Sequence, residues 1–599
     1  MADQKERIVQ NEEFAKELAE ETQHGGMNRR DFFRVASMLG MTSLAAGSLL
    51  GMSGCGGDGA DKPAPLPAVD WQGYEQESPF EIKNILIERA KKAAEKNPDL
   101  EFINAGRGNP DFLNTTARKA YGLLTLFAAQ AAEMNSKIPD LGFRVKKEGL
   151  ADALNGFVAA YTQSHPGDQA ADFLNAAMIY AQTHLHMDKD DVAFQLIDGI
   201  NGDFYPDPPR IFPVTEAIVT QYLNRVVFSG KPPADTKFNL FATEGATAAM
   251  IYVFDSLREN KILNPGDKVA IVTPIFSPYL ELPKLKDYGL ETVYIKGDEE
   301  AGWQIPDSEL EKLKDPSVKA LYMVNPTNPT SVSLSGDTVK RIANVIRTSN
   351  ENMVVISDTV YASFVDEFNT MGSELPDNII GVYSFSKYFG VTGWRLGVVM
   401  TSENCVVDKL IKALPEADKK ALDTRYSLTS LKPESIPFFE RLEMDSRQVA
   451  LAHTGGLSGP QQVGMCLFSL FELLDGDFVY KKHIQAILKS RWASLYNHVG
   501  LPAPDGKNLT RYYALIDLKK MATKMYSEGF AEKLTKGPAL KFLFRLAEHQ
   551  CVVCLPGEGF AGPEWSLRVA LANVQDKECA KVGLAIRAVM KHYYEELGD

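Results

Sequence analysis

One lysine stands out among the residues whose type and spacing could do chemistry. Lys387 lies in the run YSFSKYFGVTGWRLG, behind Ser384 and Ser386 and eight residues before Arg395. Its other neighbours are mostly aromatic or glycine, which favours a pocket, although lysine is rarely buried without a partner. In an apolar pocket beside a cation, a lysine should have a lowered pKa and react as a free amine. The alternative is an ordinary solvated loop lysine, so the rest of the sequence has to decide.

A second group of candidates follows two apolar runs that predict strands. The run TEGATAA places Gly245, Ala246 and Thr247 at the predicted start of a helix, where backbone N–H groups can approach an anion. The run PIFSPY puts Phe276 at a strand end, where its aromatic face could cover a flat ring. Each signal is weak alone, because many helices begin this way and a lone phenylalanine usually packs in the core.

Polar residues at the ends of two further runs complete this set. The run NPTNPT gives Asn328 a rigid setting between prolines, which is also typical of a turn. The run ISDTVY ends an apolar strand with Asp358, three residues before Tyr361. A carboxylate at the end of a buried strand needs a cationic partner. A protonated pyridine nitrogen would supply one.

The elements that must position these residues alternate between strand and helix. Short apolar runs after residue 238 predict strands: KVAIVTPIF, ETVYIK, KALYMVNPTNP, MVVISDTVY and IIGVYSFSK. Their alternation with helical segments predicts an α/β fold with a mostly parallel, doubly wound sheet. Functional residues in such sheets gather beyond the carboxyl ends of the strands, so we expect the candidates to meet there.

The remaining segments predict the domain organisation. FEIKNILIERAKKAAEK predicts an amphipathic helix, helical signals dominate to about residue 200, and YYALIDL to WSLRVALAN predicts a second, smaller α/β domain. We expect four parts: a signal and flexible tether (1–70), an N-terminal arm with part of the small domain and a helical insertion (71–235), the large domain that carries the candidates (236–435), and interface helices with the C-terminal small domain (436–599).

Composition excludes some classes of function. The 599 residues, 45% hydrophobic and 24% charged, make a globular chain that is too long for one ordinary domain. A net charge of −14 without a long basic run argues against a nucleic-acid partner. Cys551 and Cys554 have C-x-x-C spacing, but the two valines between them predict a buried strand rather than a redox pair. We predict no metal site, because HLH at 184–186 lacks further ligands nearby.

The first seventy residues predict export. Arg29 and Arg30, followed by DFF and a moderately apolar run, resemble a twin-arginine signal. The sequence MSGC before a Gly/Asp/Pro-rich tether resembles a lipoprotein cleavage site at Cys55, although Met52 replaces the usual leucine. We expect a periplasmic protein or one tethered to the membrane through this segment. A buried helix, a membrane anchor and a cytoplasmic location are the alternatives.

Taken together, these motifs resemble the fold-type I family of enzymes that depend on pyridoxal 5'-phosphate (PLP). In that family the pattern S-x-S-K, with an arginine eight residues on, holds the cofactor. The resemblance implies that Lys387 forms the internal aldimine and that the phosphate is bound by Ser384, Ser386, Arg395, Gly245, Ala246 and Thr247. It also implies that Asp358 pairs with the ring nitrogen, that Asn328 and Tyr361 bond to the ring oxygen, and that Phe276 stacks on the ring.

Two C-terminal segments extend the resemblance. Arg568, in SLRVALAN, lies where the family grips the α-carboxylate of the substrate, a task that suits arginine's planar fork. A surface salt bridge is the alternative for this arginine. The run HTGGLSGPQQ, residues 453–462, resembles the stretch that reaches the partner subunit's site in related dimers. A homodimer or a larger homo-oligomer is therefore expected.

More specific segments indicate the reaction. NAGRGNPDF has Arg107 directly before Gly108, and INGDFYPDPPR supplies Tyr205 where the family has a tyrosine that contacts the phosphate. From about Ser78 onward, INAGRGNP, VYSFSKYFGVTGWRLGVV and HTGGLSGPQQV resemble the L-aspartate 4-decarboxylase group. The resemblance implies β-decarboxylation of L-aspartate to L-alanine and CO₂ through a ketimine, with transamination to 2-oxo acids as a side reaction. Arg107, Gly108 and Arg568 would then contact the substrate.

Two other functions remain open at this stage. The first is a plain aspartate or aromatic aminotransferase without decarboxylation, against which Arg107 and the helical insertion count. The second is a cofactor-bearing binding or regulatory protein that has lost catalysis. The intact set of Lys387, Asp358, Arg395 and Arg568 argues against that second alternative.

Overall fold

The computed structural model describes residues 68–598, except 76, 206–209, 450 and 454. Residues Ala68–Val589 form one compact unit, and the site described below lies within it. The predicted export signal and Cys55 lie outside the described residues. In the part of the chain that the structure describes, no helix is both long enough and apolar enough to cross a membrane.

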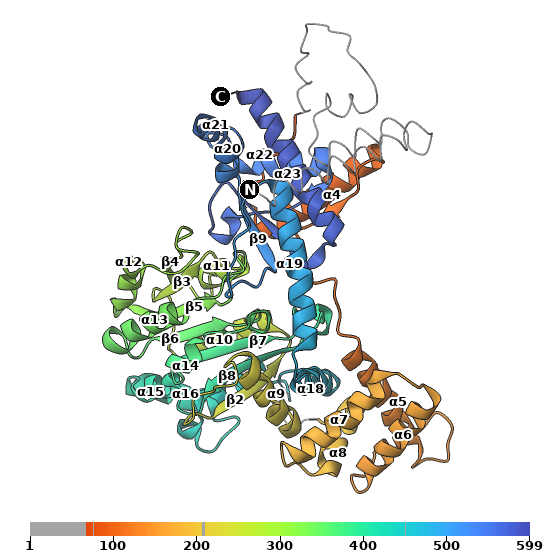
Figure 1. The fold of residues 1–599 in the computed structure, drawn as a ribbon. Helices are drawn as coiled ribbons and strands as arrows, with labels where there is room; N and C mark the ends of the chain where they lie inside the picture. The colour runs from red at the N-terminus through yellow and green to blue at the C-terminus, as the bar shows by residue number, and fades with distance from the viewer. Residues whose placement is uncertain (1–67, 76, 206–209, 450, 454, 599) are drawn as a thin grey trace, which may run out of the picture. The chain divides into compact units, whose positions relative to one another are not determined.

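A seven-stranded sheet forms the centre of the large domain (Figure 1). Its strands are β2 (Phe238–Thr243), β3 (Lys268–Thr273), β4 (Glu291–Lys296), β5 (Val318–Val324), β6 (Val354–Asp358), β7 (Ile379–Ser384) and β8 (Gly397–Ser402). The strand order is β2-β8-β7-β6-β5-β3-β4, in which β4, β3, β5, β6 and β7 are parallel and only β8 runs antiparallel to both of its neighbours. Every residue of β6, β7 and β8 is buried, which explains why their apolar runs show no alternation. The predicted mostly parallel sheet is confirmed.

Helices connect these strands and follow the sheet in the chain. They are α10 (Ala246–Glu259), α11 (Pro278–Glu281), α12 (Asp307–Leu310), α13 (Gly336–Ser349), α14 (Met371–Glu374), α15 (Val406–Lys412), α16 (Glu416–Tyr426) and α17 (Phe438–Ser446). The first of them, α10, follows β2 directly and contacts β2, β7 and β8. Its N-terminus therefore lies at the same edge of the sheet as the end of β7.

A helical bundle precedes the sheet in the chain. Its members are α5 (Thr116–Glu133), α6 (Leu150–Ser164), α7 (Gln169–Thr183) and α8 (Lys189–Asn201), drawn in orange and gold in Figure 1, and α9 (Pro213–Val226) follows. Helix α18 (Gly459–Leu474) packs against α5, α7, α8 and α9. Most residues of α18 are buried, so this helix forms the core against which the bundle helices pack.

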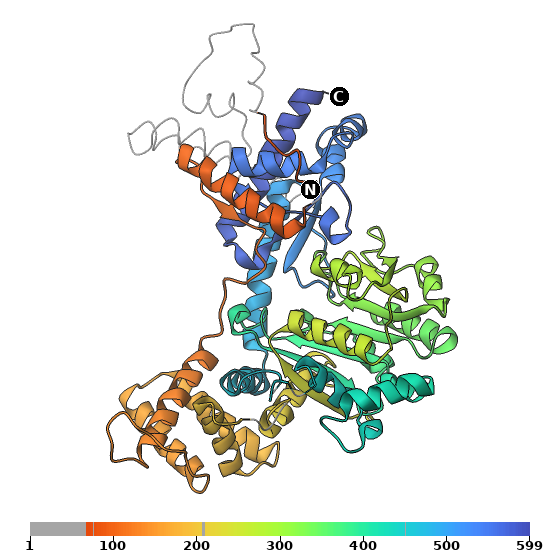
Figure 2. The ribbon, with the colours of Figure 1, turned by 180° about the vertical axis from the view of Figure 1, so that it is seen from behind.

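The N-terminal arm and the C-terminal part together build the smaller domain. Strands β9 (Tyr513–Asp517), β11 (Leu555–Pro556) and β12 (Ser566–Ala570) form an antiparallel sheet, and β1 (Ile103–Asn104) pairs with β10 (Val552–Val553). The helices are α4 (Pro79–Lys96), α19 (Val479–Val499), α20 (Leu518–Met525), α21 (Glu528–Leu534), α22 (Ala539–Gln550) and α23 (Asp576–Leu597). Helix α4 packs on α22, as Figure 2 shows from behind.

Two details bear on the sequence predictions. The two valines between Cys551 and Cys554 do form a buried strand, β10, and both cysteines are buried and free. The four domain boundaries stay predictions, although the strands of the central sheet all fall between residues 238 and 402.

Candidate active site

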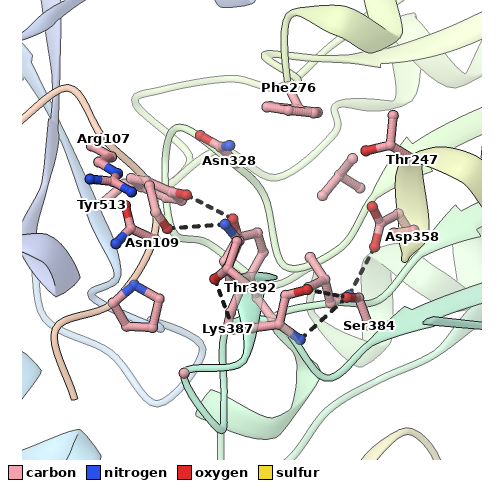
Figure 3. Close-up of a pocket in the computed structure, with 18 of the residues that line it drawn as sticks. Arg107, Asn109, Thr247, Phe276, Asn328, Asp358, Ser384, Lys387, Thr392 and Tyr513 are labelled. Carbon is pink, nitrogen blue, oxygen red and sulfur yellow. Dashed lines mark hydrogen bonds between the residues drawn. The ribbon is translucent and has the colours of Figure 1, made fainter. Parts of the chain in front are cut away.

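A cavity of about 600 Å³ opens at the carboxyl ends of the central strands. Figure 3 shows that its walls come from distant parts of the chain, including the segment with Arg107, the strand ends with Asp358 and Ser384, and Tyr513 of β9. Thirteen of the predicted site residues line it: Arg107, Gly108, Ala246, Thr247, Phe276, Asn328, Asp358, Tyr361, Ser384, Ser386, Lys387, Arg395 and Arg568. The expectation that the candidates meet at this edge is confirmed in their placement, while their individual roles stay predictions.

Lys387 is a pocket residue and not a solvated loop lysine. It lies just beyond β7, where its Nζ donates to the carbonyl oxygen of Gly108 at 3.0 Å. Burial lowers the pKa of Lys387, and the charges of Arg568 and Arg395 lower it further, against the opposing effect of Tyr513 and Asp358. The lysine is therefore prepared to react as a neutral amine.

The residue after this lysine is anchored at two points. The hydroxyl of Tyr388 donates to the buried carboxylate of Glu472 at 3.0 Å, and its carbonyl oxygen accepts from the hydroxyl of Tyr480 at 3.1 Å. Glu472 belongs to α18. The core helix thus fixes the backbone from which Lys387 extends.

One end of the cavity is built for an anion. Arg395 has a left-handed backbone conformation, and its guanidinium donates to the carbonyl oxygens of Thr392 at 2.7 Å and Glu244 at 3.2 Å. It pairs with no carboxylate among the residues that the structure describes. Ser384 and Ser386 bond to each other at 2.9 Å beside it. A guanidinium without a carboxylate partner, two hydroxyls and the N-terminus of α10 suit a phosphate group.

Gly245 supports this anion site without lining the cavity. It precedes α10 with φ of 89°, a conformation that favours glycine. A side chain here would collide with the guanidinium of Arg395. The glycine therefore leaves room for that arginine to reach the end of the cavity.

The cavity also contains one acidic group, a buried carboxyl. Asp358, at the end of β6, accepts from the hydroxyl of Tyr279 at 2.8 Å and from the backbone N–H of Val360 at 2.9 Å. Desolvation raises the pKa of Asp358 to about 6, even though both hydrogen bonds and Lys387 act against that rise. A cationic ring nitrogen would supply the missing counter-charge. Phe276, partly buried, lies nearby with its ring edge-on to Tyr279.

Arg568 is a second buried cation. It is only 1% exposed, which excludes the surface salt bridge that was its alternative. Its Nη2 donates to the carbonyl oxygen of Gly106 at 2.6 Å, and its Nη1 lies 3.4 Å from the side-chain oxygen of Asn328. Its Nε and the side-chain oxygen of Asn109 have no hydrogen-bond partner in the described part of the chain. Unpaired buried groups beside a cavity indicate a polar ligand.

Several pocket residues were missed by the sequence reasoning, and four of them bear on the chemistry of the site. Lys83 of α4, Asn109, Tyr279 and Tyr513 all line the cavity. Neither Lys83 nor Arg107 pairs with a carboxylate among the described residues, and Asp358 is the sole acid among the residues that line the cavity. Burial lowers the pKa of Lys83, and the charges of Arg568 and Arg107 add to that effect. One end of the cavity therefore carries uncompensated positive charge, which suits a ligand with more than one carboxylate.

Tyr205 is the predicted site residue that the structure places elsewhere. Its side chain is 65% exposed, and its ring stacks on that of His453 with centroids 6.3 Å apart. It does not line the cavity of its own chain. A role at the phosphate stays a prediction that requires a second subunit.

The cavity fits PLP in each of its parts. Arg395, Ser384 and Ser386 suit the phosphate, the carboxyl of Asp358 suits the pyridine nitrogen, and Lys387 has the lowered pKa that attachment to the cofactor requires. Arg395, Asp358 and Lys387 form no ion pair with any residue that the structure describes, so their charges are available to the cofactor.

Comparison with known proteins agrees with the fold and the site. A model of the family described as aminotransferase class I and II matches residues 215–586, and the chain belongs to this PLP-dependent family. Two solved structures share the fold alone. They are the alanine aminotransferase of Pyrococcus furiosus (TM-score 0.53, 18% identity, 86% of this chain and 97% of that chain) and the N-succinyldiaminopimelate aminotransferase of Mycobacterium tuberculosis (TM-score 0.51, 16% identity, 88% and 100%).

One relative is similar over almost its whole length. It is the bifunctional aspartate aminotransferase and L-aspartate beta-decarboxylase of a Pseudomonas species, 42% identical over 532 residues, which are 88% of this chain and 98% of the relative. The aspartate aminotransferase of Sulfurisphaera tokodaii is 32% identical over 193 residues, which are 31% of this chain and 45% of that relative.

Proposed function

We propose that this chain is a PLP-dependent L-aspartate 4-decarboxylase, which converts L-aspartate to L-alanine and CO₂ and also transfers the amino group to 2-oxo acids. The observation that carries the proposal is the 42% identity to the bifunctional relative over 98% of that relative's length. The cation-rich end of the cavity supports it, because aspartate brings two carboxylates.

The residues that would hold PLP follow from the site. Ser384, Ser386, Arg395 and the N-terminus of α10 bind the phosphate, Asp358 keeps the ring nitrogen protonated, and Lys387 provides the attachment point. When bound, PLP supplies an electron sink conjugated to the Cα of the amino acid. Lys387, with its lowered pKa, takes the proton from Cα and later returns one.

Three cations of the cavity bind different carboxylates of the substrate. Arg568 is fixed by Gly106 and Asn328, so it suits the α-carboxylate, whose position must not change. Lys83 and Arg107 have no such bonds within the described part of the chain, and they offer positive charge to the second carboxylate without a fixed position. A carboxylate that must leave as CO₂ should be held loosely, since strong ionic binding would stabilise the ground state.

The decisive experiment follows three products at once. The purified protein is incubated with PLP and L-aspartate while CO₂, alanine and oxaloacetate are measured. Equimolar CO₂ and alanine, both abolished in Lys387→Ala, are the expected result. Transfer of the amino group to 2-oxoglutarate without CO₂ would contradict the proposal and leave a plain aminotransferase.

The functional unit is a homodimer or a larger homo-oligomer. In support, Tyr205 is exposed beside His453, which begins the segment 453–462 that resembles a partner-contacting stretch. Tyr205 would reach the phosphate site of the partner subunit. Light scattering on the PLP-loaded protein tests the assembly, and a monomer would overturn it.

The N-terminal segment directs export by a twin-arginine route. Support comes from Arg29 and Arg30 and from the apolar run after them, with Cys55 as the lipid-attachment candidate. Replacing Arg29 and Arg30 with lysines should retain the protein in the cytoplasm. Recovery of the unmodified protein in the cytoplasmic fraction, with residues 1–70 intact, would refute export.

A further inference from the structure

We infer that Tyr513 is a catalytic residue, the acid that delivers a proton to the β-carbon of the substrate when CO₂ leaves. The inference rests on the proposed function and deepens it. It assigns a group to the one step that decarboxylation requires and transamination lacks.

The proton balance of decarboxylation shows why an acid beside Cβ is required. Aspartate and one proton become alanine and CO₂: the bond between Cβ and its carboxylate breaks, and the electron pair returns to Cβ as a new C–H bond. Transamination neither breaks nor makes a bond at Cβ. A decarboxylase therefore needs a donor beside Cβ in addition to the lysine that works at Cα.

Few groups in the cavity can release a proton there. The hydroxyl of Tyr279 is committed to Asp358 at 2.8 Å. Guanidinium groups do not release protons in proteins, and Lys387 is assigned to Cα. Lys83 is assigned to the leaving carboxylate as its cation, and burial raises the pKa of Tyr361, which makes that hydroxyl a poor acid. Among the described residues, the hydroxyl of Tyr513 has one hydrogen-bond partner, the hydroxyl of Tyr361 at 2.9 Å. It is therefore bound neither to a carboxylate nor to the backbone.

The position of Tyr513 fits the role. Its hydroxyl would lie 2.7 Å from a side chain added at Gly108, so it reaches the segment whose carbonyl oxygen binds Lys387. Its ring lies 4.6 Å from the guanidinium carbon of Arg568. Tyr513 thus adjoins both the proposed α-carboxylate site and the lysine. Figure 3 shows it with Arg107 and Asn109 at one end of the cavity and Asp358 at the other.

The residues around Tyr513 also stabilise the phenolate that remains after this tyrosine has given its proton to Cβ. The guanidinium of Arg568 lies over the ring, so a phenolate at Tyr513 adjoins a cation. Burial raises the pKa of Tyr361 well above its ordinary value, and this hydroxyl therefore stays protonated and can donate to the phenolate. Water that enters the cavity restores the proton of Tyr513 before the next cycle.

The test compares Tyr513→Phe with the wild type in the PLP-loaded, full-length protein. Decarboxylation should fall by roughly 100-fold or more, as the loss of a general acid predicts, while transamination to 2-oxoglutarate falls by less than about 10-fold. The Kd of the unreactive dicarboxylate succinate, measured by calorimetry, should change by less than about 3-fold. Tyr496→Phe, which alters a buried tyrosine of α19 outside the cavity, is the matched control.

A second substitution at Tyr513 tests whether a different proton donor can replace the phenol. Tyr513→His, which restores a proton donor, should regain decarboxylation relative to Tyr513→Phe. A parallel loss of both reactions, or decarboxylation that survives in Tyr513→Phe, would overturn the inference and leave the proposed function intact. Absence of CO₂ in the wild type itself would instead overturn the proposed function and the inference with it.

Discussion

Asp358 shows at the scale of a single residue how the protein prepares a site for a cation. Its carboxyl is buried and accepts two hydrogen bonds, yet its pKa is raised to about 6 because desolvation outweighs them. Without the cofactor, an ionised carboxylate at neutral pH therefore destabilises the fold. The ring nitrogen of PLP would remove that penalty, so cofactor binding and folding are coupled through one side chain.

This coupling predicts a pH-dependent gain in stability for Asp358→Asn. Because the folded protein holds the proton more tightly than the unfolded chain, the contribution of Asp358 to the free energy of unfolding rises as pH falls below about 6. The PLP-free variant should gain on the order of 3 kcal/mol relative to the PLP-free wild type at pH 7.5, and about half of that gain should vanish by pH 5. Urea unfolding at both pH values measures it. A gain of equal size at both would show that Asp358 titrates normally.

Helix α10 and strand β8 show how elements build the anion site together. Because β8 runs antiparallel to β2, its residue Gly397 lies against the backbone of Gly245, and a side chain on Gly397 would come within 2.6 Å of that glycine. Arg395 enters from the turn before β8, into the space that Gly245 leaves free. The phosphate site thus depends on the close approach of two backbones, and neither element could form it alone.

The expected consequence is that Gly245→Ala weakens PLP binding specifically. The added methyl group displaces the guanidinium of Arg395, so the Kd of PLP should rise by at least about 10-fold. Gly266→Ala is the control, since Gly266 has the same φ of 89° but no atom within 4 Å of an added side chain. Absorbance titration with PLP separates the two effects. Equal losses in both variants would mean that backbone strain, and not the collision, is responsible.

The secondary-structure elements also explain which site residues could be predicted from the sequence and which could not. The parallel strands were predictable because each is a continuous apolar run, and Asp358 and Lys387 because they end such runs. Lys83 could not be found, since a lysine on an amphipathic helix normally faces water. Tyr513 could not be singled out because it adjoins Tyr512 at the start of β9, and only Tyr513 lines the cavity. Their placement depends on how the arm and the C-terminal part fold together, as in the pairing of Ile103 with Val552.

At the scale of the whole molecule, Tyr205 bears on whether subunits share their active sites. It is exposed and does not line the cavity of its own chain. If its partner is the phosphate site of a second subunit, each active site combines residues of two chains. The functional unit would then be the assembly, and a defect in one chain could be repaired by the other.

Co-expression of two inactive variants tests this sharing. Tyr205→Ala and Lys387→Ala subunits each lack one contribution, but a mixed dimer contains one complete site. Random pairing of equal amounts should therefore restore about a quarter of the wild-type activity per subunit. The separately purified variants, mixed without subunit exchange, are the control. Activity no greater than that of this control would place Tyr205 outside the site of the partner.

The positive end of the cavity has a consequence for the catalytic cycle. Lys83, Arg107 and Arg568 are gathered there in a chain with a net charge of −14, and Asp358 is the one acid that lines the cavity. Aspartate arrives with a net negative charge, whereas alanine carries none and CO₂ is neutral. Each turnover thus removes the charge by which the ligand was held, and product departs without competing for the site. Alanine should be a far weaker inhibitor than succinate, and the reaction should proceed at high product concentrations.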